Sequence, residues 1–159
     1  MSADVTLILI ITATAASGIL AGASLDQSIK QLPARHRIGV VNYSSYSRAS
    51  DLGNGILWYG ILGVSAALLT MAAGVAAYLV GLSTVKATPV YIGALLAVLH
   101  SLATTQAAPT NFSQRKVADD EAALAVIFNR FERWQAIRCA LQVIAFGVML
   151  WALVAYTSR

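Results

Sequence analysis

Charged residues are scarce in this sequence. Only 11% of its 159 residues are charged, whereas 58% are hydrophobic and the mean hydropathy is +0.69. Soluble domains carry about 25% charged residues, so the deficit predicts a chain that lies largely in lipid. The length fits one domain, residues 1–159. The net charge of +4 does not indicate nucleic-acid binding, because the basic residues are divided between two loops and form no basic face.

The residues that build most metal and cofactor sites are also nearly missing. Cys139 is the lone cysteine, which excludes an internal disulfide and a thiolate metal cluster. His36 and His100 are the two histidines, too few for paired bis-histidine haem sites. The HExxH, GxxxxGK[S/T], GxSxG and CxxC motifs are absent. The sequence therefore predicts no metal site and no cofactor.

Four long apolar runs are present instead, each close to or above the roughly 20 residues that span a bilayer. They cover approximately residues 4–25, 53–82, 87–107 and 135–157. Their pattern predicts an all-α membrane protein with four transmembrane helices in an antiparallel bundle. Gly81 is expected to end the second helix, and Thr88 and Pro89 to begin the third as N-cap and first helical residue.

The first run also resembles a signal peptide, because residues 21–23 read Ala-Gly-Ala, like a cleavage site. The first five residues hold no Lys or Arg, however, and the apolar stretch exceeds the usual length. A retained transmembrane span is favoured. Within it, the GxxxG spacing of Gly18 and Gly22 predicts close packing against another helix.

Basic residues predict how the chain crosses the membrane, since cytoplasmic loops are enriched in Lys and Arg. Eight lie in the two long loops and two on the opposite side: Lys30, Arg35, Arg37 and Arg48 in the first loop, Arg115, Lys116, Arg130 and Arg133 in the second, and Lys86 and Arg159 opposite. We expect a multi-pass protein of the cell membrane with both long loops in the cytoplasm and both termini outside.

The second long loop carries a helical pattern of its own. Acidic residues at 119–121 suit a helix start, and Leu124, Ile127, Phe128 and Phe131 follow at helical spacing. This predicts an amphipathic helix before the fourth span that runs on into it. The favoured interpretation is an anchor in the membrane interface.

Polar residues converge where the four spans meet the cytoplasmic side. Such residues in a bilayer tend to face the bundle interior and to mark function, so the sequence predicts a polar pocket in that half of the bundle. The residues concerned are Asp26, Gln27 and Lys30, then Asp51, Asn54, Trp58 and Tyr59, then His100, Thr104 and Gln106, then Trp134, Gln135, Arg138, Cys139 and Gln142.

Each of these residues also has a structural interpretation that leaves no role in a pocket. Arg138 can snorkel to the interface, and His100 can hydrogen-bond a neighbouring helix. Trp58 and Trp134 fit the aromatic belt of a membrane protein. Taken together, one imidazole, one or two carboxylates and one fixed cation suit proton abstraction from a lipophilic acid, with stabilisation of the resulting anion.

Two segments carry a resemblance to a known family. The first segment is GILAGASLDQSIKQLPARHRIGVVNY. It resembles the small-residue first span with its Leu-Pro loop in the anthrone-oxygenase-like family of small four-helix membrane proteins. The second, QAAPTNFSQRKVADDEAALAVIFNRFERWQAIRCAL, resembles the Pro-x-Asn loop, the aromatic helix and the Trp-x-x-x-Arg start of the last span in the same family. Pro109, Asn111, Trp134 and Arg138 occupy the motif positions. The family often has Asn before this Arg, where the present chain has Ala-Ile. The resemblance implies oxygenation of an anthrone to an anthraquinone without metal or flavin.

Two hypotheses for the function follow. In the first, the protein is an enzyme acting on a lipophilic aromatic or quinone-like substrate; its residues would be His100 or Asp26 as base, Arg138 with Gln142 and Asn111 at the substrate oxygen, and Trp58, Tyr59 and Trp134 around the ring.

In the alternative hypothesis the chain is a non-catalytic small subunit, assembly factor or lipid-binding partner. Arg138 would then pair with Asp26, Asp51 or Glu132, or with a lipid phosphate. The expected partners are membrane lipids, a lipophilic small molecule, and a second copy or a larger membrane complex. A roomy cavity beside His100 and Arg138 would favour the enzyme, and tight pairing with carboxylates would favour the alternative.

Overall fold

The computed structural model describes residues 3–117 and 119–158, and these are almost entirely helical, with no strand among them. Four helical segments are long and apolar enough to cross a membrane: Ala3–Ile38, Val40–Val80, Thr84–Lys116 and Glu121–Thr157. The predicted all-α class with four candidate spans is therefore confirmed. Each segment runs beyond the span expected from hydropathy, because helical residues continue past the apolar stretch.

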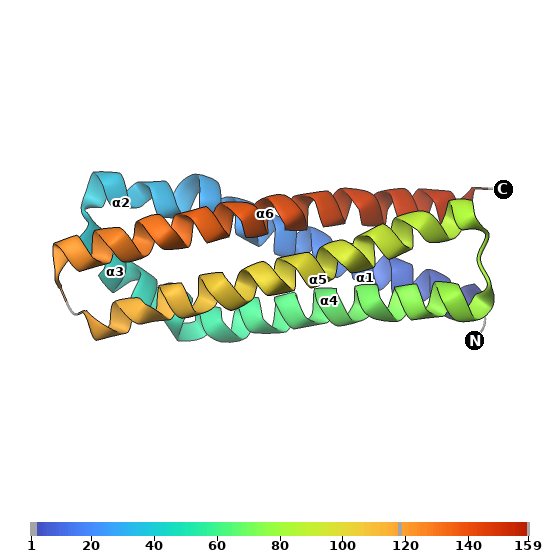
Figure 1. Cartoon of the computed structure of the whole chain (residues 1–159), viewed down its shortest axis with the longest axis horizontal. Helices are drawn as coiled ribbons and strands as arrows, with labels where there is room; N and C mark the ends of the chain where they lie inside the picture. Colours follow the sequence, from blue (N-terminus) through green and yellow to red (C-terminus); the bar gives the residue numbers. More distant parts are fainter. Residues whose placement is uncertain (1–2, 118, 159) are drawn as a thin grey trace.

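Four long helices form the body of the molecule: α1 (Ala3–Asp26), α4 (Gly55–Val80), α5 (Thr84–Phe112) and α6 (Glu121–Thr157). α1 and α5 each pack against both α4 and α6, so the four helices form a closed ring of neighbours. Successive long helices alternate in direction, and both ends of the chain lie with the α4–α5 turn at one end of the bundle, which we call the terminal end (Figure 1).

The opposite end, the loop end, is built from shorter elements (Figure 1). α1 continues through the π-helical segment η1 (Gln27–Gln31) into α2 (Leu32–Ile38), and α3 (Val40–Ala49) leads through the π-helical segment η2 (Ser50–Asn54) into α4. A 3-10 turn, η3 (Ser113–Lys116), closes α5. The two long loops of the sequence are thus folded helical structure.

The sequence predicted the end of one helix and the start of another, and the structure confirms only the first. Gly81 ends α4 in the left-handed conformation (φ 67°), as expected of a glycine at this position. The predicted start of the third span is wrong, since α5 begins at Thr84 after Ser83 and Pro89 lies in its second turn. The carbonyl of Ser83 already accepts from the amides of Lys86 and Ala87, which closes a helical turn ahead of the proline.

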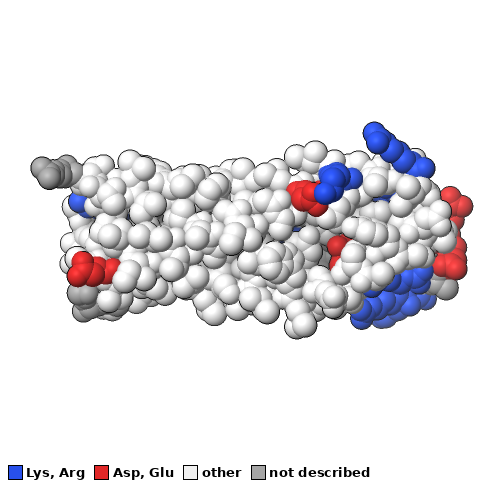
Figure 2. All heavy atoms as spheres, turned by 180° about the vertical axis from the view of Figure 1, so that it is seen from behind, with Lys and Arg blue, Asp and Glu red and all other residues white. Residues whose placement is uncertain are grey.

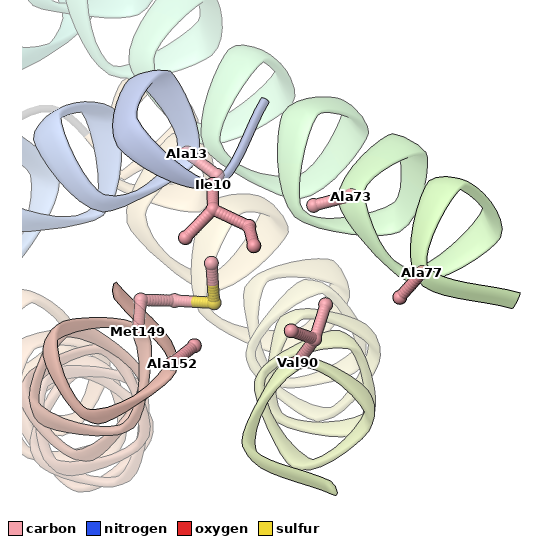
Figure 3. Packing of buried hydrophobic residues seen from close by; sticks show 7 residues of the cluster. All are labelled: Ile10, Ala13, Ala73, Ala77, Val90, Met149 and Ala152. Carbon is pink, nitrogen blue, oxygen red and sulfur yellow. The ribbon is translucent and has the colours of Figure 1, made fainter. Parts of the chain in front are cut away.

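The terminal half of the bundle is held by small and flexible side chains. Its core consists of Ile10, Ala13, Ala73, Ala77, Val90, Met149 and Ala152. Figure 3 shows the Met149 side chain reaching from α6 toward Ile10 and Val90. A Cβ on Gly93 would stand 2.6 Å from the Met149 sulfur, so this glycine makes room for it. Small residues allow such close helix packing where no hydrophobic driving force acts between helices in lipid.

A second core at the loop end covers the amphipathic part of α6. It consists of Leu32, Val40, Tyr43, Ala107, Leu124, Phe128 and Phe131. The rings of Tyr43 and Phe128 meet edge to face at 5.0 Å. The predicted continuity of this helix with the fourth span is confirmed, and Asp120 caps it by accepting from the Ala123 amide at 3.0 Å. The interfacial-anchor interpretation is wrong for the apolar face, because α2 and α3 bury it.

Charged side chains gather at the loop end and leave the middle of the molecule almost free of charge (Figure 2). Arg35 pairs with Glu132 at 2.7 Å and Arg48 with Asp119 at 3.3 Å. At the terminal end, Lys86 donates to backbone carbonyls in the last turn of α6, where a cation is favoured. Arg159, used in the topology prediction, lies outside the described residues. The distribution is consistent with a chain that crosses a membrane several times.

Gly18 and Gly22 provide a matched test of close packing. A Cβ on Gly18 would stand 2.8 Å from the Phe146 ring of α6, whereas one on Gly22 meets no atom within 4 Å. Gly18→Ala should therefore unfold more easily than Gly22→Ala by about 1–3 kcal/mol, the usual cost of overpacking. Unfolding in detergent micelles measures the difference. Equal stability of the two variants would contradict the packing assigned to Gly18.

Candidate functional site

A cavity of about 240 Å³ lies in the loop-end half of the bundle. Every long helix contributes to its wall, together with η1 and η2. The lining residues are Leu20, Gln27, Asp51, Leu52, Gly55, Ile56, Tyr59, Gly60, Gly63, His100, Thr104, Ala108, Asn111, Phe112, Phe131, Arg138 and Gln142. The cavity thus occupies the half of the bundle where polar residues converge in the sequence. For scale, a cavity of about 150 Å³ admits benzene.

Arg138 brings the cation to this cavity. Its Nη2 donates to Oε1 of Gln27 at 3.3 Å, while its Nε is buried without a partner. No ion pair joins Arg138 to a carboxylate within 4 Å among residues 3–117 and 119–158. The side chain lines the cavity. Of the three carboxylates expected as pairing partners, Asp26 is occupied by Lys30 and Glu132 by Arg35, whereas Asp51 lines the same cavity and makes no ion pair with Arg138 within 4 Å.

The Arg35–Glu132 pair lies at the loop end, before the apolar stretch of α6. The guanidinium donates to the carboxylate and holds the pKa of Glu132 below its ordinary value. Arg35 is also fixed by the carbonyl of Leu32 and the side chain of Asn129. This pair secures α2 against α6 and leaves Arg138 as the cation of the cavity.

His100 brings an imidazole to the cavity wall from α5. The residue is only 5% exposed, and its Nδ1 is buried without a hydrogen-bond partner. The hydroxyl of Thr104, one turn further along α5, donates to the His100 carbonyl at 2.8 Å. A void of about 10 Å³ continues behind His100 and Gln142 towards the terminal end. His100 and Gln142 therefore form the inner end of the main cavity.

The carboxylate in the cavity belongs to Asp51 and not to Asp26. Asp51 is 8% exposed and lines the wall. Asp26, proposed from the sequence as the less favoured base, lies outside the lining, where it pairs with Lys30 and accepts from Gln31 at 2.5 Å. Asp26 is the last residue of α1, whereas Asp51 lies within the π-helical segment η2. Asp51 was among the converging polar residues, but nothing in the sequence placed it inside.

A buried network behind Asp51 was missed by the sequence analysis. The Ser47 hydroxyl donates to Oδ2 of Asp51 at 2.9 Å. Gln114, which is fully buried, donates from Nε2 to Ser47 Oγ at 3.3 Å and to Asn111 Oδ1 at 2.7 Å, and its Oε1 accepts from Ser44 at 3.0 Å. Gln114 therefore connects two residues of the cavity wall. The four-residue spacing of Ser47 and Asp51 was the one available signal.

Arg115 fixes the same wall from outside. Its Nη2 donates to the Leu52 carbonyl at 2.6 Å. This carbonyl lies in η2, where Gly53 departs from helical geometry (φ −93°, ψ −119°). A kinked turn leaves backbone groups without helical partners, so the guanidinium replaces a lost backbone hydrogen bond. It thereby holds Asp51 and Leu52 in place.

The aromatic residues named from the sequence divide between wall and surface. Tyr59 lines the cavity, whereas Trp58 is 54% exposed and Trp134 packs against the loop-end core. Adjacent residues on a helix point about 100° apart, so Trp58 and Tyr59 cannot share one face. Phe112 and Phe131 supply the other aromatic walls.

Two amides complete the polar part of the cavity. Asn111 and Gln142 both line it, as the sequence analysis proposed. Gln142 accepts from the Ser24 hydroxyl of α1. No group of three His, Cys, Asp or Glu side chains close enough to hold a metal occurs in the described part of the chain. With Gln27 and the hydroxyls of Tyr59 and Thr104, the cavity therefore presents one cation, one imidazole, one carboxylate, three amides and two hydroxyls between apolar and aromatic walls.

Comparison of the chain with known protein families, curated proteins and solved structures finds no match. The resemblance to anthrone-oxygenase-like proteins therefore stays a prediction. The chemistry of the site is therefore inferred from the geometry of its own residues.

Gln114 and Gln106 give a matched test of the network. Gln114→Leu would leave Ser44 and the side chain of Asn111 without their partner inside the protein, and should destabilise the fold by about 1–3 kcal/mol. Gln106→Leu changes an exposed residue of the same helix and should stay within about 0.5 kcal/mol of the wild type. Unfolding in detergent measures both. A Gln114 variant as stable as the Gln106 variant would show that the network does not support the cavity.

Proposed function

We propose that this chain is a membrane-embedded, cofactor-independent oxygenase acting on a lipophilic aromatic or quinone-like substrate. One observation carries the proposal: the Arg138 guanidinium, which makes no ion pair within 4 Å in the described part of the chain, shares a cavity with His100, whose buried Nδ1 has no hydrogen-bond partner. A buried charge without a partner is costly to a structural protein. A ligand with an ionisable oxygen would supply the missing partner.

Polar residues of the cavity have roles in the proposed reaction that follow from their chemistry. His100 takes a proton from an acidic C–H or O–H group of the substrate, and Asp51, the carboxylate that lines the same cavity, adds a negative charge that favours the imidazolium. Arg138 binds the oxygen on which negative charge develops, where a fixed cation in a water-poor site is most effective. Asn111 and Gln142 offer amide groups to the same oxygen.

The reaction balances with O2 as the only oxidant. Proton transfer from a ring methylene to His100 leaves a carbanion whose charge is delocalised onto the oxygen held by Arg138. The carbanion carbon forms a bond to O2, and the distal oxygen takes the proton back from His100 to give a hydroperoxide. Loss of the second C–H proton and cleavage of the O–O bond then yield the ketone and water. One methylene and one O2 become one carbonyl and one water.

The non-catalytic alternative keeps the same cavity with a different consequence. A lipid-binding or partner subunit would hold a lipophilic acid between Arg138 and the aromatic walls and release it unchanged. The structural form of this alternative required a pairing of Arg138 with Asp26, Asp51 or Glu132. Asp26 and Glu132 are bound elsewhere, and Asp51 lines the same cavity without an ion pair to Arg138 within 4 Å in the described residues. Binding and turnover must therefore be measured separately.

Replacement of Arg138 tests the function directly. With anthrone as substrate in lipid nanodiscs, Arg138→Met should lower anthraquinone formation and O2 consumption by about 100-fold or more, the usual cost of losing an oxyanion partner. Arg133→Met, which changes an exposed arginine of the same helix, is the control and should retain wild-type rates. Asp26→Asn should also remain close to wild type, whereas Asp51→Asn should slow turnover.

Two results would count against the enzyme. Full turnover by the Arg138 variant would remove the oxyanion role and with it the proposal. Anthrone binding by the wild type that depends on Arg138, without any anthraquinone formed, would establish the lipid-binding alternative.

We propose further that the loop end lies in the cytoplasm of a cell-membrane protein, because most of the basic residues are there. Single cysteines test this in a Cys139→Ala background. A membrane-impermeant maleimide added to intact cells should label Ser83→Cys at the α4–α5 turn but not Ala122→Cys at the loop end; both positions are exposed. Lysed cells should label both. The reverse pattern in intact cells would invert the topology.

A further inference from the structure

The cavity opens to the side of the bundle, between α4 and α5. Its exposed lining residues are Ile56 and Gly60 of α4 and Phe112 of α5. Ile56 and Phe112 are 40% and 39% exposed, whereas His100 and Asn111 deeper in the cavity are nearly buried. Nearer the terminal end the same two helices touch, since a Cβ on Gly74 would stand 3.6 Å from that of Ala94. The two helices are therefore in close contact at this level, on the terminal side of the cavity.

The surface beside this opening is apolar. Leu57, Ile61 and Val64 are exposed on α4, and Leu99 and Leu102 on α5. In a membrane protein such a surface contacts acyl chains. A molecule dissolved in the bilayer can therefore reach the cavity without crossing water.

Two glycines form the α4 side of the opening. Gly60 and Gly63 line the cavity in the second and third turns of α4, and a Cβ on either would meet no atom within 4 Å. Glycine weakens a helix interior relative to alanine, so these positions bear a cost that close helix packing does not explain. Gly55 differs, because a Cβ there would clash with the Ser50 carbonyl at 2.7 Å.

We propose that Gly60 and Gly63 keep open a lateral entrance for a flat substrate of several fused rings, which passes from the bilayer to Arg138 and His100. Glycine allows a ligand to lie directly against the helix backbone, and on the other side the opening is bounded by the ring of Phe112. Side-chain size at positions 60 and 63 thus sets the width of the ring system that enters. This inference rests on the proposed function and adds to it the shape of the substrate and its route.

The test compares a wide and a narrow probe, anthrone with three fused rings and phenol with one, by equilibrium binding to protein in lipid nanodiscs. Gly60→Leu and Gly63→Leu should weaken anthrone binding by roughly tenfold or more, as added bulk does in a fitted pocket. Phenol binding should change by less than about twofold, as expected where no contact is lost. The smaller Gly60→Ala and Gly63→Ala should weaken anthrone binding less and should not lower the unfolding temperature.

Gly147→Leu is the matched control. Gly147 is also an exposed glycine inside a helix, and a Cβ there meets no atom within 4 Å, but it does not line the cavity. This variant should bind both probes like the wild type. Arg138→Met should lose both probes, because it removes the group that binds their oxygen.

Each other outcome has a distinct meaning. Unchanged anthrone binding in the leucine variants overturns the entrance, while the loss of both probes in Arg138→Met would still support the proposed site. Equal loss of phenol and anthrone in the glycine variants also overturns the width filter, since it indicates collapse of the cavity. A wild type that binds phenol and not anthrone contradicts the substrate shape. A wild type that binds neither contradicts the entrance and the proposed function together.

Discussion

The position of Arg138 is the constraint on which the rest of the site depends. A guanidinium inside a membrane bundle must be surrounded by acceptors or by a polar cavity, because lipid cannot solvate it. Here one nitrogen donates to Gln27 and another has no partner, and neither Asp26, which precedes Gln27, nor Glu132, which lies six residues before Arg138, pairs with it. Those carboxylates bind Lys30 and Arg35 instead. The local ion pairs at the loop end thus leave Arg138 available for a ligand oxygen.

The two halves of the bundle are packed in different ways. In the terminal half, alanine, glycine and the adaptable Met149 let the helices approach closely. In the loop-end half, α2 and α3 cover α6, and the Gln114 network with Arg115 fixes η2. This second core acts as a rigid support for the cavity wall. A low water content inside the cavity would strengthen the attraction between Arg138 and a substrate anion.

Much of the fold could be predicted from the sequence, because lipid imposes strict requirements on a spanning chain. Unpaired backbone groups are so costly in hydrocarbon that a long apolar run must be helical. This requirement determined the four spans, and local chemistry determined the end at Gly81 and the cap at Asp120. Helical periodicity and the distribution of charge also predicted that His100 and Arg138 lie in the same half of the bundle.

Only the tertiary structure decided which polar residues share the cavity. Helical spacing shows that residues lie on one face, but it does not show which neighbour covers that face. Asp51 lines the cavity and Asp26 lies outside it, and packing against α2, α3 and α5 buried an apolar face of α6 that a membrane interface could equally have covered. Trp58 was directed outward and Tyr59 inward by the rotation of α4 against its partners. Rotation and register depend on contacts between helices far apart in the chain, so local sequence could not fix them.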